Sequence, residues 1–164
     1  FGFPFPLLLL LLCRRAMLLG WMFRVRVALQ LPRRTMFLAT LYLDRALSPL
    51  PFGHCTAVVA AHHLQLLGTA CLVLASTMED GSPTRAELSA FVYYTQNSFS
   101  VAQLAATVMH LCAASSFELC ATTPDDVLHS LMDQLEDEIP LPPRSTAARL
   151  LRSVRRHALV GIVL

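Results

Sequence analysis

Lysine is absent from the sequence, and all thirteen basic residues are arginine. Without a lysine, these 164 residues hold no P-loop lysine, no Schiff-base lysine and no lysine general base. Charged residues of either sign are also scarce, at 15% of the chain against 55% for apolar residues. This composition favours one domain built around a sizeable apolar core.

Cysteine and histidine are present, but without the spacing of a metal site. The five cysteines are odd in number, form no CxxC and mostly lie in apolar runs, which favours reduced thiols packed in a core. The adjacent His62 and His63 would point about 100° apart on a helix, so they are poorly placed to share a metal. No nucleophile–base–acid set is visible either. The sequence therefore predicts no metal, no cofactor and no small-molecule substrate, and an enzyme is the least favoured class.

The charges are segregated along the chain. Residues 1–50 carry seven arginines and one acid, residues 51–143 carry one arginine and ten acids, and residues 144–164 carry five arginines and no acid. We interpret this pattern as a basic and an acidic face of a globular domain. Because the arginines are not interleaved with exposed aromatic residues or Gly-rich loops, we predict no nucleic-acid partner.

Two apolar runs raise the question of a membrane. The leucine run at 7–12 is too short to span a bilayer, which needs about 20 residues. The run at 56–76 is long enough, but it contains histidines and Gln65 and lacks flanking arginines. We therefore predict no membrane partner, and a membrane or secreted helical protein remains the third hypothesis.

The apolar periodicity predicts helices throughout and no strand. Three-to-four spacing and breaking residues predict helices over 13–30, 33–47, 56–76, 84–94, from 100 onward, 123–135 and 145–164, with a loop at 79–83. The 56–76 segment is apolar nearly all round, which is typical of a central helix buried by its neighbours.

Three sequence patterns predict where helices begin. T-x-x-E at 84–87 and S-x-x-Q at 100–103 match the capping box, in which two side chains bond each other's backbone N–H groups. Thr123 is predicted as a third N-cap, with a proline at the first helical position and Asp125 and Asp126 in the first turn.

Six stretches of the sequence occur together in the order and near-spacing of one known family. They are RRAMLLGWMFRV at 14–25, LATLYLDRALS at 38–48, LQLLGTACLVLAS at 64–76, YYTQNSFS at 93–100, FELCATTPDDVLHSL at 117–131 and RRHALVGIVL at 155–164. On these residues the chain resembles the D-type cyclins. The resemblance implies an all-α fold, a cyclin-box five-helix bundle around a buried central helix plus an additional C-terminal helix. The implied organisation is an apolar segment outside the fold at 1–12, a cyclin N-terminal box at 13–135, a linker at 136–144 and the start of a truncated second box at 145–164.

The resemblance also implies a function. A cyclin-like chain would be a regulatory subunit that binds and activates a cyclin-dependent serine/threonine kinase at the G1/S transition, in nucleus and cytoplasm, without doing chemistry itself. The alternative is a degenerate cyclin-fold interaction module that no longer activates a kinase.

Two sets of binding residues follow from the resemblance. The kinase-binding positions fall on Leu74, Thr77, Met78, Val108, Phe117 and Leu119. In the family, a lysine and a glutamate at two of these positions make the polar contacts with the kinase. Thr77 and Val108 stand there in this chain, so both charges are absent. For Phe117 and Leu119, plain core packing is an equally good interpretation.

The second set would dock substrate motifs of the Arg-x-Leu kind. It falls on Met17, Trp21, Leu64 and Gln65. The family's acidic position is Arg24 here, which should repel a basic peptide, and Trp21 taken alone is more typical of a core residue.

The resemblance finally gives a role to Asp44, which lies in the apolar run LYLDRALS at 41–48. A buried carboxylate is costly unless it is paired. The family pattern implies an ion pair between Arg15 and Asp44 that joins the first two helices, whereas the alternative has Asp44 facing solvent. Arg45 is expected to be solvated.

Overall fold

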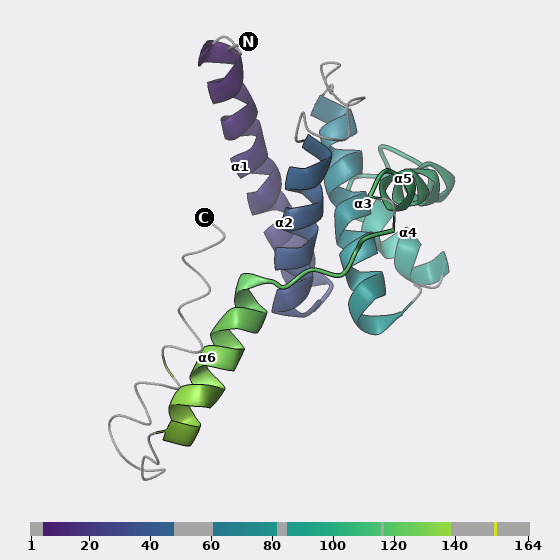
Figure 1. The fold of residues 1–164 in the computed structure, drawn as a ribbon. Helices are drawn as coiled ribbons and strands as arrows, with labels where there is room; N and C mark the ends of the chain where they lie inside the picture. The colour runs from purple at the N-terminus through teal and green to yellow at the C-terminus, as the bar shows by residue number, and fades with distance from the viewer. Residues whose placement is uncertain (1–4, 48–60, 82–84, 116, 139–152, 154–164) are drawn as a thin grey trace. The chain divides into compact units, whose positions relative to one another are not determined.

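The computed structural model describes residues 5–47, 61–81, 85–115, 117–138 and 153 (Figure 1). Within these residues the helices are α1 (Phe5–Ala28), α2 (Arg33–Leu47), α3 (Ala61–Asp80), α4 (Arg85–Tyr93), α5 (Val101–Ala114) and α6 (Pro124–Glu138). No strand occurs within these residues, so the predicted all-α class is confirmed. The chain divides into two compact units, Phe1–Cys120 with α1 to α5 and Ala121–Leu164 with α6.

Helix α3 is the centre of the first unit. It packs against α1, α2, α4 and α5, as the arrangement of ribbons in Figure 1 shows. Its residues 70–75 are all buried, and Ala70, Cys71 and Leu72 have no exposed surface. Thr69 is also fully buried, and its hydroxyl donates to the Gln65 carbonyl at 2.7 Å within the same helix. The predicted buried central helix is therefore present, and it runs to Asp80 instead of giving way to a loop at 79.

Helix α1 begins at Phe5, whereas the sequence predicted a start at residue 13. Leucine favours the helical conformation, so the leucine run can extend the helix. Pro6, the second residue of α1, has no backbone N–H, but N–H groups in the first turn of a helix have no partner within the helix in any case. At the other end, Gln30 adopts a positive φ of 56° and the Leu31 N–H bonds the Arg26 carbonyl at 3.0 Å. Pro32 follows, and it supplies no N–H to continue the helix.

The start of α5 follows the predicted capping box. Gln103 N donates to Ser100 Oγ at 3.2 Å, and Ser100 N donates to Gln103 Oε1 at 2.8 Å. Two orphan N–H groups are thereby satisfied reciprocally. The box predicted at Thr84 lies outside the described residues.

Helix α6 belongs to the second unit and has the predicted N-cap. Asp126 N donates to Thr123 Oγ1 at 3.3 Å, while Thr123 N donates to Asp126 Oδ2 at 2.8 Å. The unit begins at Ala121, and the predicted domain limits stay predictions. Residues 136–138 of the predicted linker are part of α6, and the helix predicted over 145–164 lies outside the described residues apart from residue 153.

Candidate functional site

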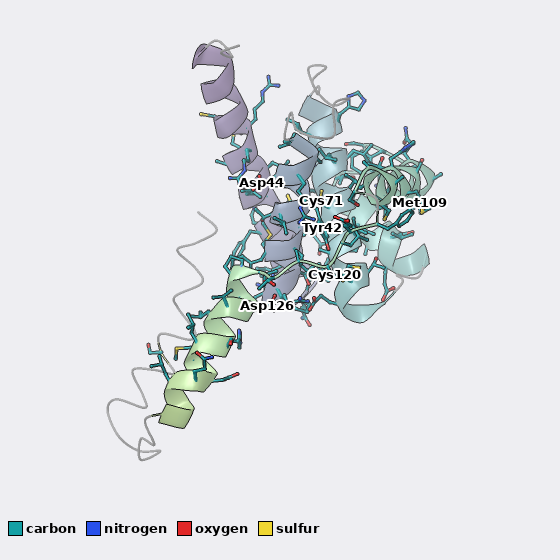
Figure 2. All side chains as sticks on the ribbon, in the orientation of Figure 1. Tyr42, Asp44, Cys71, Met109, Cys120 and Asp126 are labelled. Carbon is teal, nitrogen blue, oxygen red and sulfur yellow. The ribbon has the colours of Figure 1, made fainter. Side chains whose placement is uncertain are left out.

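Arg15 of α1 and Asp44 of α2 form a bidentate ion pair. Arg15 Nε lies 2.6 Å from Asp44 Oδ1, and Nη2 lies 2.8 Å from Oδ2. The hydrogen bond to Asp44 raises the pKa of Arg15. The implied pair is thus present, but its side chains are 35% and 44% exposed, so the carboxylate is less buried than the apolar run suggested. In Figure 2, Asp44 lies on the α1 side of α2, where the pair joins the two helices.

The opposite side of α2 holds the segment that follows α5. The buried Tyr42 donates its hydroxyl to the Leu119 carbonyl at 2.7 Å, and burial raises the pKa of Tyr42. Arg45 Nη1 also donates to the Glu118 carbonyl at 3.2 Å, in an exposed hydrogen bond that the expectation of a solvated Arg45 did not include. Sequence reasoning missed this pair of contacts. The only available signal was that Tyr42 and Arg45, three residues apart, share one face of the helix.

This segment presents Phe117 outward. Phe117 has a positive φ of 60° and its N–H bonds the Cys112 carbonyl at 3.0 Å, which turns the chain out of α5. Its side chain is 66% exposed, so core packing is not the explanation for this residue. Such a backbone conformation is unusual for a bulky residue and costs about 1–2 kcal/mol.

An apolar hollow, here called the α3–α5 groove, lies beside the segment. Its volume is about 300 Å³. It is lined by Tyr42, Arg45, Ala46, Leu67, Leu74, Thr107, His110, Leu111, Ala114, Ser115 and Leu119. The fold therefore brings together Leu74 and Leu119, two of the residues implicated by the resemblance, from positions far apart in the sequence. An apolar floor with a few polar groups is the usual composition of a protein recognition groove.

The other implicated residues are not part of the lining. The Thr77 hydroxyl donates to the Val73 carbonyl at 2.8 Å within α3, and Val108 is half-buried on α5. Met78 is 38% exposed. Threonine and valine are neutral, so these two positions provide no charge for a partner.

The second implicated surface lies where α1 crosses α3. Met17 is 76% exposed, Trp21 and Gln65 are half-buried, and Leu64 is buried. The two helices come close at Gly68, because a Cβ there would lie 3.0 Å from Leu18 Cδ1 and 3.1 Å from Met22 Sδ. Leu64 and Gln65 precede Gly68 by about one turn of α3.

Neither a metal cluster nor a membrane span is found within the described part of the chain. No three His, Cys, Asp or Glu side chains there are grouped to hold a metal ion. No helix among those residues combines the length and the apolar character needed to cross a bilayer.

The bundle of α1 to α5 around a buried α3 is a cyclin-box fold. Residues 11–120 match the family model described as the cyclin N-terminal domain, and the chain belongs to this family. The match ends where the first compact unit ends. Cyclins as a family are regulatory subunits and not enzymes.

The chain is similar to cyclins of more than one class. It is 36% identical to cyclin-A1 of Carassius auratus over 111 residues, which are 68% of this chain and 26% of that protein. It is 31% identical to G1/S-specific cyclin-D2 of Gallus gallus over 150 residues, 92% of this chain and 45% of the relative. With G2/mitotic-specific cyclin-A of Drosophila melanogaster the identity is 32% over 109 residues, 66% of this chain and 20% of the relative. The chain thus spans less than half the length of these curated relatives.

Proposed function

We propose that this chain is the kinase-binding part of a D-type-like cyclin, a regulatory subunit that binds and activates a cyclin-dependent serine/threonine kinase at the G1/S transition. The observation that carries the proposal is the α3–α5 groove, with Leu74 and Leu119 in its lining and Phe117 exposed on the adjoining segment. Similarity to the G1/S-specific cyclin-D2 extends over 92% of the chain, which favours the D-type over the A-type assignment.

The groove suits an amphipathic helix of the partner. A helix laid into an apolar groove binds through anchors repeated every three or four residues, and exposed aromatic side chains are frequent hot spots. Arg45 and His110 are among the polar residues that line the groove and could bond such a helix. By holding the partner's regulatory helix, the subunit would stabilise the active arrangement of the kinase without taking part in phosphoryl transfer. We propose nucleus and cytoplasm as its location, to be tested by imaging of the tagged chain.

Binding is tested by retention on purified cell-cycle kinases at micromolar concentration. We expect Phe117→Ala to weaken binding at least about tenfold, because it removes an exposed anchor beside the groove. The matched control is Tyr93→Ala, since Tyr93 on α4 is 69% exposed and lies outside the groove lining. Failure of the unaltered chain to bind, or an equal loss in both variants, would refute the kinase-binding role.

The alternative function is a cyclin-fold module that binds a kinase without activating it. It is favoured by one observation, the absence of charge at Thr77 and Val108. Activation therefore needs its own assay, in which phosphorylation of a peptide substrate is measured with saturating chain. We expect Thr77→Lys combined with Val108→Glu to raise kinase activity more than the sum of the single changes, because the two groups act on the same partner surface. Tight binding with no activity in the unaltered chain would select the alternative.

A further inference from the structure

Three of the five polar side chains that line the α3–α5 groove are already used by the fold. The Tyr42 hydroxyl donates to the Leu119 carbonyl at 2.7 Å. The hydroxyls of Thr107 and Ser115 each donate to the carbonyl four residues earlier in α5, both at 2.9 Å. A hydroxyl has one proton to donate, so these three groups keep no donor for a partner.

The other two polar residues of the lining, Arg45 and His110, keep donors that a partner can use. Arg45 spends one N–H on the Glu118 carbonyl, and a guanidinium has five. His110 is exposed and makes no hydrogen bond or ion pair within the described part of the chain. No aspartate or glutamate is among the described lining residues. The free groups are therefore a permanent positive charge and an imidazole, which can gain a positive charge but not a negative one.

The position of these two residues sets where a partner's polar groups would lie. Helix α3 lies between α2, which carries Arg45, and α5, which carries His110 (Figure 1). The buried Leu67 and Leu74 of α3 are seven residues apart, or about 10 Å along the helix axis. A partner helix that runs along α3 covers this length with apolar anchors at its positions i, i+3 and i+7. Positions i+4 and i+6 then lie on the two sides of that apolar stripe.

We propose that the α3–α5 groove favours a partner helix that carries acidic side chains on both sides of its apolar stripe, paired with Arg45 and His110. This inference rests on the proposed function, in which the kinase presents the helix. A lysine at either position would bring a positive charge to a groove that has no carboxylate in its described lining to receive it. Because Thr77 and Val108 provide no charge, Arg45 and His110 determine which partner helices are accepted.

Two matched peptides test this preference for acidic side chains. Both are alanine-rich helices with leucines at i, i+3 and i+7 and a neutral fluorophore, with glutamate at i+4 and i+6 in one and lysine in the other. The full chain is titrated into each peptide, and fluorescence anisotropy gives the Kd. We expect the glutamate peptide to bind at least about tenfold more tightly than the lysine peptide at low salt, with a smaller difference at high salt.

Charge changes in the chain test the assignment to the two residues. We expect H110E to reduce the preference for the glutamate peptide at least about fivefold, because it places a carboxylate in the groove. The matched control is H63E, since His63 is exposed on α3 and lies outside the groove lining, and it should keep the preference. R45Q removes the permanent charge and should also reduce the preference. Far-UV circular dichroism establishes that the three variants are folded.

Retention of the unaltered chain on purified kinases is measured alongside, so that the two proposals are tested separately. Equal affinity for the two peptides, no saturable binding of either, or an unchanged preference in H110E would overturn the inference, and the proposed function would stand if the kinase is retained. A chain that is not retained on any kinase would refute the proposed function, whatever the peptides do.

Discussion

The close approach of α1 to α3 at Gly68 allows a quantitative prediction. Replacing Gly68 with alanine has two opposing effects on the free energy of unfolding. Helix propensity favours alanine over glycine by about 0.8–1.0 kcal/mol. The new methyl group, however, would lie 3.0 Å from Leu18 Cδ1 and 3.1 Å from Met22 Sδ, closer than the 3.5–4.0 Å of an optimal carbon contact.

The packing penalty should exceed the gain in propensity. Met22 has no exposed surface and Leu18 is only 8% exposed, so both side chains are enclosed by neighbours that restrict their movement. Overpacking of this kind costs about 1–3 kcal/mol. We therefore expect Gly68→Ala to lower the free energy of unfolding by about 1 kcal/mol net, within a range of about 0–2 kcal/mol.

Gly20→Ala is the matched control. Gly20 lies in α1, and a Cβ there would meet no atom within 4 Å. We expect this variant to be more stable than the unaltered chain by about 0.8–1.0 kcal/mol, because only the propensity changes. Urea unfolding followed by far-UV circular dichroism gives both values, and their difference isolates the packing penalty. If the two variants differ by less than about 0.5 kcal/mol, α1 does not pack on α3 as described.

Four further predictions concern single groups. Asp44→Asn should lower stability by about 1 kcal/mol at low salt and by less at high salt in urea unfolding, because the carboxylate partner of Arg15 is partly exposed; a salt-independent loss would contradict this explanation. Cys71 should resist a thiol reagent that labels the exposed Cys13, because burial, and secondarily the Asp44 charge, raises the pKa of Cys71; equal labelling rates would contradict its burial. The same raised pKa predicts that stability measured against pH falls as pH rises past about 8.5, where the unfolded thiol ionises and the folded one does not, and a flat profile there would refute it. Tyr42→Phe should cost about 1–3 kcal/mol in urea unfolding, because it leaves a carbonyl after α5 without its donor, and it should weaken kinase binding too; unchanged values for both would show that this bond does not hold the segment.

Local patterns predicted much of the fold because the interactions behind them are local. The capping box at Ser100 and the N-cap bond of Thr123 join residues three apart, so spacing in the sequence is enough to identify them. The burial of α3 was predictable because its sequence is apolar nearly all round the helix, so no polar side faces solvent. The start of α1 was predicted too late because the leucine run was interpreted as a segment outside the fold. A run of leucines is equally able to extend a helix.

The candidate site was predictable only where the family pattern had already linked distant positions. The pair Arg15–Asp44 spans 29 residues and was named from the resemblance, not from periodicity. The bonds from Tyr42 and Arg45 reach backbone carbonyls 77 and 73 residues away, and a carbonyl carries no sequence signal because every residue has one. The kinase-binding and peptide-docking roles of the named residues stay predictions.

The sequence by itself determined the helical class, most helix limits, the charge segregation and the loss of charge at Thr77 and Val108. The tertiary structure alone decided that Leu74 and Leu119 line one groove and that Phe117 is exposed beside it. The physical reason is that helix formation depends on neighbours within a few residues, whereas a groove or a surface depends on how the helices pack. That packing is fixed by contacts such as the one at Gly68, whose partners lie about fifty residues earlier in the chain.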